Sequence, residues 1–179
     1  HSTTKYINGH SDVIGGAVIT NDSEILSKLK FWANNLGIAG SPFDSYLALR
    51  GLRTLSLRMK QHEQNASALV ELLSNHPKIS HVYYPGLKHH PSHEIAKKQQ
   101  SGFGGMLSFE IKNGLSGVKN FIDNLNILSL AGSLGGFESL VGHPYTMTHA
   151  ALSAEQKKDI GIKENLIRIS AGLENTEDL

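Results

Sequence analysis

The sequence predicts an α/β protein, in which short strands alternate with helices. Residues 15–20 form a short apolar run that begins with two glycines, which suits a buried strand. Residues 25–36 and 52–73 carry apolar side chains at the spacing of one face of a helix. After Pro77, short apolar runs alternate with segments of helical periodicity. This order of elements is typical of α/β or α+β architecture.

The first half of the chain contains start signals for two helices. Asp22 or Ser23 can cap the first helix, and Pro42 lies in the first turn of the second. The apolar stripe of the second helix continues to Pro77, which is longer than one average helix. We therefore expect a kink or a break near Gly51.

The second half predicts several shorter elements. Strands are expected at residues 79–84, 106–111, 127–130 and 166–170, and helices at residues 116–124 and 153–159. The acidic run at residues 174–178 is typical of the first turn of a further helix. We place a domain boundary within residues 60–77 and divide the chain into residues 1–65 and 66–179.

The composition argues against several classes of function. With 17 basic and 16 acidic residues, the formal net charge of +1 argues against binding of nucleic acid or an anionic membrane. Its apolar stretches are too short to span a bilayer, and no signal peptide is visible. The absence of cysteine means that an oxidising compartment is not required. We therefore expect a cytoplasmic protein.

Lys5 is the first candidate for chemistry. It follows closely on Ser2 and Thr4, whose hydroxyls can donate hydrogen bonds to a phosphate group. A lysine amine that is tuned by its surroundings can bond to an aldehyde cofactor. In an extended segment, Ser2 and Thr4 would point to the same side. The same residues are compatible with a surface turn and a solvated lysine, the commoner setting of this residue.

A rival chemistry uses the same residues. Ser2 and Lys5 have the Ser-x-x-Lys spacing of acyl-serine enzymes, in which the lysine activates the serine. Ser11 and Asp12 begin the second motif of that class, but Val13 stands where asparagine is needed. No Lys-Thr-Gly motif follows, so this interpretation rests on one spacing alone.

Ser133 and Arg168 are candidates for binding a ligand. Ser133 comes shortly before Gly135 and Gly136, where the backbone can approach a ligand closely. A hydrolase elbow is not indicated, because Ala131 stands where glycine is required. Arg168 interrupts an apolar strand, so it forms a structural ion pair or faces a pocket that binds a carboxylate. The residues alone leave both alternatives open.

Two other patterns carry little weight. His89, His90 and His93 lie among polar loop residues and do not form a coherent set of ligands, so no metal site is predicted. Gly102 and Gly104 precede a strand, whereas a dinucleotide-binding fingerprint precedes a helix.

Taken together, the motifs resemble those of one family, the pyridoxal-phosphate (PLP) enzymes of Cys/Met metabolism, or transsulfuration family. Its cofactor-lysine signature is matched almost residue for residue by HSTTKYINGHSDVIGG at residues 1–16. Further similar stretches are SPFDSYLALRGLRTLSLRM (41–59), YPGLKHH (84–90), GFGGMLSFE (102–110), SLGGFESLVGHPYTMTH (133–149) and residues 161–178. Ordered motifs at matching intervals are far more specific than any single motif.

The resemblance implies roles for five residues. Lys5 is similar to the lysine that bonds PLP covalently, and Ser2 and Thr4 are similar to the hydroxyls that bind the cofactor's phosphate. Ser133 and Arg168 are similar to the residues that hold the α-carboxylate of the substrate. The freed amine of the lysine would move protons to and from the substrate.

The resemblance also implies a fold and an assembly. The fold is the aspartate-aminotransferase-like fold type I, with the end of the large PLP-binding domain in residues 1–65 and the small C-terminal α+β domain in residues 66–179. The assembly is a homotetramer made of two dimers. Several cofactor contacts of the family precede the lysine, so the chain is expected to be a fragment that is inactive alone.

The implied activity is that of a carbon–sulfur lyase or transferase acting on a sulfur-containing amino acid. The motifs are most similar to cystathionine γ-synthase and γ-lyase, which implies γ-elimination or γ-replacement on cystathionine or activated homoserine. Methionine γ-lyase, cystathionine β-lyase and homoserine sulfhydrylase are alternatives within the family. An acyl-serine hydrolase and a non-catalytic binding module are alternatives outside it. Gly132 replaces a glutamate common among the γ-enzymes, which leaves the leaving group open.

Overall fold

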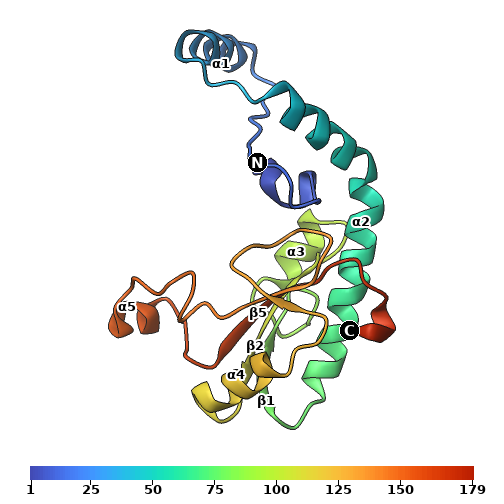
Figure 1. The fold of residues 1–179 in the computed structure, drawn as a ribbon, viewed down its shortest axis with the longest axis vertical. Coiled ribbons are helices and arrows are strands. Elements are labelled where there is room, and N and C mark those ends of the chain that lie inside the picture. The colour runs from blue at the N-terminus through green and yellow to red at the C-terminus, as the bar shows by residue number, and fades with distance from the viewer. The chain divides into compact units, whose positions relative to one another are not determined.

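The computed structural model describes residues 1–179, and the chain divides into two compact units. The first unit is His1–Ser56 and the second is Leu57–Leu179, so the division lies within one long helix. In chain order the elements are η1 (Thr3–Ile7), α1 (Ser23–Leu36), α2 (Pro42–Ser74), β1 (Ile79–Tyr83), α3 (His93–Gln99), β2 (Met106–Ile111), α4 (Gly114–Asp123), β3 (Ser129–Leu130), β4 (Leu140–Gly142), α5 (Ala154–Asp159), β5 (Leu166–Ser170) and η2 (Thr176–Asp178), as labelled in part in Figure 1. None of these helices is both long and apolar enough to cross a bilayer.

The second unit is built on a mixed five-stranded sheet in the order β1-β2-β5-β4-β3. The neighbouring strands are antiparallel except β3 and β4, which are parallel. The predicted strands at residues 106–111 and 166–170 are confirmed with the same bounds as β2 and β5. The short strand β4 was not predicted, because three apolar residues within a glycine-rich stretch give little periodicity. The predicted α/β class is confirmed.

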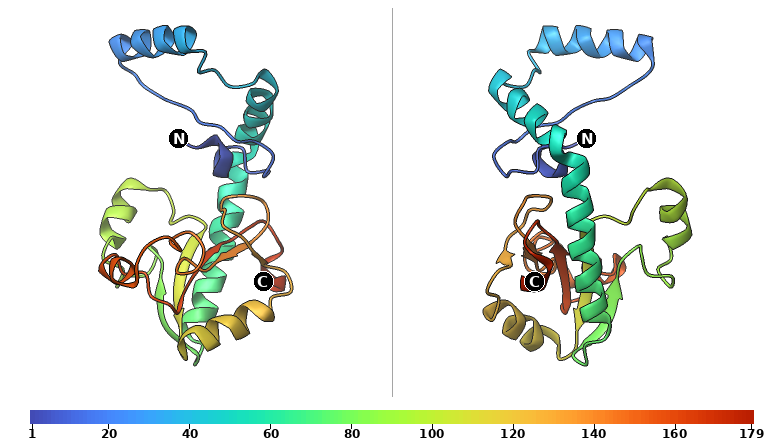
Figure 2. Two further views of the ribbon diagram at one scale, coloured as in Figure 1. Left: turned by 60° about the vertical axis from the view of Figure 1, so that its left-hand side comes forward. Right: turned by 90° about the vertical axis from the view of Figure 1, so that its right-hand side faces the viewer.

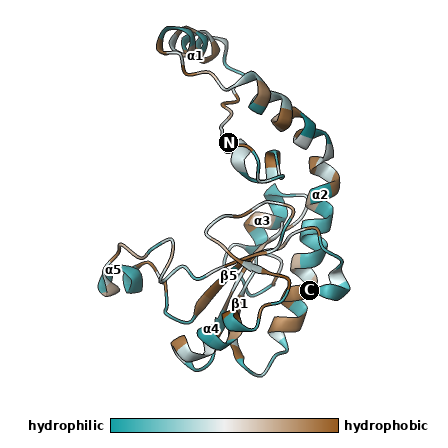
Figure 3. Ribbon diagram, viewed as in Figure 1, coloured by the Kyte–Doolittle hydropathy of each residue, from teal (hydrophilic) through white to brown (hydrophobic).

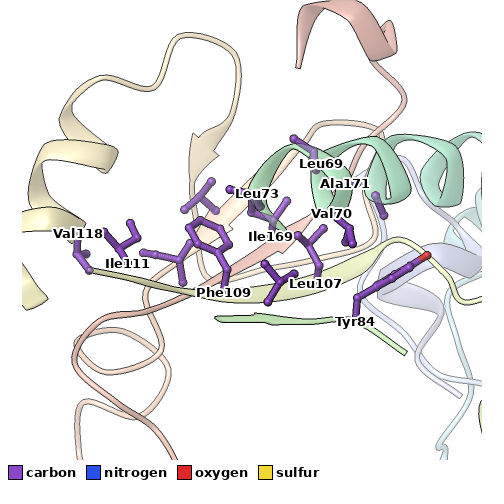
Figure 4. Close-up of a cluster of buried hydrophobic side chains, with 14 residues drawn as sticks. Leu69, Val70, Leu73, Tyr84, Leu107, Phe109, Ile111, Val118, Ile169 and Ala171 are labelled. Atoms are coloured by element: carbon purple, nitrogen blue, oxygen red, sulfur yellow. The ribbon is translucent and has the colours of Figure 1, made fainter. Parts of the chain in front are cut away.

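The core of the second unit lies between the later part of α2 and one face of the sheet. Both views in Figure 2 show this part of α2 alongside the strands. Figure 4 shows the apolar cluster, in which Leu69, Val70 and Leu73 of α2 lie over Leu107, Phe109 and Ile169 of the sheet. Phe109 is fully buried at the centre of β2. The apolar stripe along α2 is therefore the surface that the sheet covers.

The first unit contains α1, the start of α2 and the segment around η1. Asp22 caps α1, as predicted, by accepting hydrogen bonds from the amides of Glu24 and Ile25 at 2.8 and 3.0 Å. The predicted strand at residues 15–20 is wrong, because only a single bridge between Ser2 and Gly16 forms there. A strand needs a neighbour for its backbone groups along its whole length. Figure 3 shows apolar residues along α1 and the early turns of α2.

Of the kink or break expected near Gly51, the break does not occur, because α2 continues through this residue without interruption. The glycine serves another purpose. A Cβ atom at position 51 would lie 2.2 Å from the carbonyl oxygen of Asn8, so the missing side chain lets the Asn8 backbone lie against the helix. Two smaller differences are α3, which was not predicted, and the acidic C-terminal run, which forms a 3₁₀ turn.

Glu110 is a buried carboxylate in β2 of the second unit. Its Oε1 accepts hydrogen bonds from the hydroxyl of Tyr83 at 2.5 Å and from Nζ of Lys163 at 2.8 Å. Burial alone would raise the pKa of Glu110, but the hydrogen bonds from Lys163 and Tyr83 outweigh it and lower the pKa below 4.5. Burial and the bond to Glu110 raise the pKa of Tyr83 to about 12.

These shifts predict how Glu110 stabilises the fold as pH changes. A lowered folded pKa stabilises the protein fully above the unfolded pKa, and this contribution is lost as pH falls through the folded value. We expect Glu110→Gln to lower the free energy of unfolding at pH 7 and to lose this effect progressively below about pH 4.3. Tyr83 acts in the opposite sense, because its pKa is raised in the folded protein. Its contribution to the stability of the fold is therefore lost as pH rises from 10 to about 12. Urea unfolding from pH 3 to 8 measures the Glu110 effect, with the exposed Glu71→Gln as the control; a pH-independent difference would contradict it.

Candidate functional site

Lys5 lies in the tight π-type turn η1 of the first unit. Its backbone leaves the helical region, with φ −101° and ψ −135°. The turn is closed by backbone hydrogen bonds from Asn8 N to Thr3 O at 3.2 Å and from Gly9 N to Lys5 O at 2.8 Å. Lys5 is half-buried, so this turn presents an amine that is only partly exposed to solvent.

Thr4 and Ser2 lie beside Lys5 but not in one extended segment, so the alternation of side chains along a strand does not apply to them. Ser2 is extended and exposed, and it pairs with Gly16, whereas Thr4 lies inside the turn. The hydroxyl of Thr4 accepts from the amide of Gly15 at 3.0 Å and donates to its carbonyl oxygen at 3.2 Å. A threonine hydroxyl has one hydrogen and two lone pairs. Thr4 can therefore donate to a phosphate by rotating its hydrogen while it keeps the bond from Gly15.

The segment that follows Lys5 is anchored by residues that were not identified from the sequence. Asn8 is almost fully buried, and its side-chain amide donates to Asp12 Oδ1 at 2.6 Å. The ring Nδ1 of His10 lies 2.7 Å from the carbonyl oxygen of Asn8. On the other side, the Asn8 backbone lies against Gly51 of α2. These contacts fix the turn that carries Lys5 to the helix within the first unit.

Arg168 lies in β5, between Ser108 of β2 and Gly142 of β4. Its Nη2 donates to the backbone carbonyl oxygen of Ser133 at 2.8 Å, and its Nε is buried without a hydrogen-bond partner. A Cβ atom at position 142 would lie 3.3 Å from Nη2, so glycine there leaves room for the guanidinium. Within this chain Arg168 takes part in no ion pair.

The unpartnered Nε of Arg168 has a chemical consequence. A buried guanidinium nitrogen without an acceptor is unfavourable, and an arginine fork suits the two oxygens of a carboxylate. Ser133 is exposed beside this arginine. The arrangement can therefore bind an anionic group with planar, paired oxygens.

The remaining motifs have structural roles in the second unit. Nδ1 of His93 lies 2.7 Å from the carbonyl oxygen of Pro85, and its ring stacks on Phe103. The amide of Phe103 donates to the carboxylate of Glu63 at 2.6 Å, and a Cβ atom at Gly102 would collide with that carboxylate. His93 and Gly102 thus support the packing of Phe103 beside Glu63 of α2.

The structure brings the five predicted residues together in two sets. Ser2, Thr4 and Lys5 lie in the first unit, and Ser133 and Arg168 lie in the second. Each set has its own geometry, and the hydrogen bond between Arg168 and Ser133 joins residues 35 positions apart.

Comparison with known proteins identifies the family. The family described as Cys/Met metabolism PLP-dependent enzyme matches residues 1–179, which is the whole chain. The chain belongs to this family. Among curated relatives, it is 50% identical over 179 residues to cystathionine γ-lyase of Dictyostelium discoideum and to cystathionine γ-synthase of Escherichia coli, and 51% identical to cystathionine β-lyase of Lactococcus lactis. These alignments cover all of this chain and 46 to 47% of each relative.

Solved structures give the same result. A cystathionine γ-synthase of Xanthomonas oryzae in complex with cystathionine matches with a TM-score of 0.95 and 55% identity. The match covers 100% of this chain and 46% of that one. The chain therefore spans about half the length of the relatives that it matches. Membership of a PLP-dependent family removes the basis of the acyl-serine interpretation, which rested on one spacing.

The donor groups of the first unit fit PLP. The cofactor has an aldehyde, which a lysine amine can bond, and a phosphate, which hydroxyl groups can bind. Lys5 supplies the amine, and Ser2 and Thr4 supply hydroxyls within three residues of it. Lys5 is half-buried, and the backbone of its turn is anchored through Asn8.

Replacing Gly51 tests the anchoring of this turn. Alanine normally stabilises a helix relative to glycine by about 1 kcal/mol. At position 51, however, the added methyl would collide with the Asn8 backbone. We therefore expect Gly51→Ala to lower the free energy of unfolding by about 1–3 kcal/mol. It should also weaken retention of PLP, read from the visible absorbance of the dialysed intact protein. Gly40→Ala is the matched control, because its Cβ would make only an ordinary contact of 3.5 Å; equal behaviour of the two variants would contradict the anchoring.

Proposed function

We propose that the intact protein containing this chain is a PLP-dependent transsulfuration enzyme that performs γ-elimination or γ-replacement on cystathionine or an activated homoserine. Its family is established over the whole chain. The relatives include proteins named cystathionine γ-lyase and cystathionine γ-synthase, and a γ-synthase structure with cystathionine matches closely. Methionine γ-lyase of Fusobacterium nucleatum, at 49% identity, and the β-lyases keep the same-family alternatives open.

One observation supports the site assignment above all others. The guanidinium of Arg168 is fixed by the carbonyl oxygen of Ser133, and its buried Nε has no partner. An amino-acid substrate supplies the missing acceptor through its α-carboxylate. We assign Ser133 and Arg168 to substrate binding on this basis. The sulfur-containing class of substrate comes from the family and not from this pair.

The other residues have distinct tasks in this proposal. PLP, when bound, supplies the electron sink that makes cleavage of a Cα–H bond possible. The amine of Lys5 would act as a general base that takes a proton from the substrate Cα and then, as the ammonium, as the general acid that returns a proton to carbon. Once it has released that proton, it would also remove a β proton in γ-chemistry. Ser2 and Thr4 hold the phosphate through hydroxyl donors. Arg168 orients the substrate by binding its α-carboxylate.

The fold type and the assembly belong to the same proposal. We assign residues 1–65 to the end of a large PLP-binding domain of fold type I and residues 66–179 to the small C-terminal domain. The mixed α/β sheet of the second unit and the similarity to family structures support this assignment. We further propose a homotetramer composed of two dimers and a location in the cytoplasm.

The role of Lys5 is tested by covalent trapping in the intact protein. Borohydride converts a lysine–aldehyde linkage into a stable secondary amine, which survives digestion and is located by mass spectrometry. We expect a phosphopyridoxyl group on Lys5, and no adduct on this peptide in Lys5→Ala. The exposed Lys30→Ala should retain both the adduct and the activity. An adduct on a different lysine, or no adduct at all, would overturn the assignment.

Substrate comparison tests the reaction class. We expect the intact enzyme either to cleave cystathionine or to replace the ester group of an activated homoserine by cysteine, measured as keto-acid release or cystathionine formation. The faster of the two reactions decides between lyase and synthase. Activity on methionine with neither of these reactions would exclude both and favour methionine γ-lyase.

A further inference from the structure

The loop that contains Ser133 is held along its length by the segment that follows Arg168. Five hydrogen bonds join residues 133–139 to residues 170–174: Gly135 N to Ser170 Oγ (2.9 Å), Leu173 N to Phe137 O (2.7 Å), Gly172 N to Ser139 Oγ (2.8 Å), Ser139 N to Glu174 Oε1 (2.6 Å) and Ser139 Oγ to Glu174 Oε2 (2.8 Å). A Cβ atom at Gly172 would lie 2.4 Å from the carbonyl oxygen of Phe137. The backbone at Gly172 thus lies so close to that at Phe137 that no side chain fits between them.

Glu174 closes the far end of this contact with both carboxylate oxygens. Oε1 accepts from the amide of Ser139 at 2.6 Å, and Oε2 accepts from its hydroxyl at 2.8 Å. Ser139 is fully buried, so neither of its donors has water as an alternative partner. Hydrogen bonds to an ionised carboxylate are stronger than those between neutral groups. Glu174 therefore restrains this end of the loop through two hydrogen bonds.

The segment that carries Glu174 is itself fixed to α2. Asn65, which is fully buried, donates from Nδ2 to the carbonyl oxygens of Gly172 at 3.0 Å and Glu174 at 2.9 Å. Nδ1 of the buried His62 lies 2.7 Å from the carbonyl oxygen of Ala171, so this nitrogen donates there. Because α2 packs on the sheet, Glu174 holds the loop against a rigid frame rather than a mobile tail.

We infer that Glu174 is a positioning residue for the substrate-carboxylate site, an inference that rests on the proposed function of Ser133 and Arg168. The loop includes Gly135, with φ 76°, and Gly136, so its sequence gives it little stiffness of its own. Its position is set by its hydrogen bonds. Loss of the Glu174 bonds lets the loop move, and the Ser133 carbonyl that fixes Nη2 of Arg168 moves with it.

The inference is tested with two ligands that differ only in the carboxylate. L-norleucine and pentylamine share the same amine and chain, and neither has a leaving group; both are titrated against the visible absorbance of the intact holoenzyme. We expect Glu174→Gln to weaken binding of L-norleucine about tenfold, the factor for one charge-assisted hydrogen bond, and to change binding of pentylamine less than about twofold. The matched control is Glu177→Gln, an exposed residue of η2, which should change neither.

The outcomes separate this inference from the proposed function. Equal weakening of both ligands, or no weakening, in Glu174→Gln overturns the positioning role. Arg168→Lys tests the site itself, and an unchanged preference for L-norleucine over pentylamine there overturns the carboxylate assignment. A lost preference in Arg168→Lys with a normal one in Glu174→Gln overturns the positioning role alone. If Glu174→Gln fails to fold, Ser139→Ala replaces it, because this variant keeps the bond from the amide of residue 139 to Glu174. It is judged in the same way, by whether binding of L-norleucine weakens more than binding of pentylamine.

Discussion

The buried polar side chains of α2 hold together the parts of the second unit that matter for binding. The apolar face of this helix covers the sheet. Asn65 and His62 lie outside that apolar layer and donate hydrogen bonds to backbone carbonyl oxygens of the segment that follows β5. A buried amide or imidazole without partners would destabilise the fold, so both must find acceptors. The acceptors that they find lie directly after the strand of Arg168. Packing of the core and placement of the carboxylate site are thus achieved by the same helix.

Close backbone approach is the second constraint, and glycines make it possible at three places. Gly51 admits the backbone of Asn8, Gly172 admits that of Phe137, and Gly142 leaves space for the guanidinium of Arg168. In each case a Cβ atom would meet a group that belongs to, or supports, a proposed functional residue. These glycines act by the room that they leave and not through backbone freedom, because none of the three has a positive φ.

The sequence predicted most of the regular elements and proposed five site residues, but not the contacts that position them. The strands of Phe109 and Arg168 were found with correct bounds, because their apolar runs are set off from their surroundings. The strand expected at residues 15–20 does not form, because an apolar run indicates burial but does not show which strand it would pair with. Glu174 and Ser139 lie in stretches that resemble the family, yet they bond across 35 residues, which no local pattern reveals. The gap is one of long-range geometry.

Sequence identity alone does not separate the activities within this family, since the chain is about equally similar to relatives named γ-lyase, γ-synthase and β-lyase. The part of these relatives that the chain matches is therefore compatible with different reactions. Gly132 is informative here. A Cβ atom at this position meets nothing within 4 Å, and the residue has no positive φ, so neither packing nor backbone requires a glycine. Within this chain, position 132 could therefore carry a side chain, including the glutamate that the family resemblance leads one to expect before Ser133.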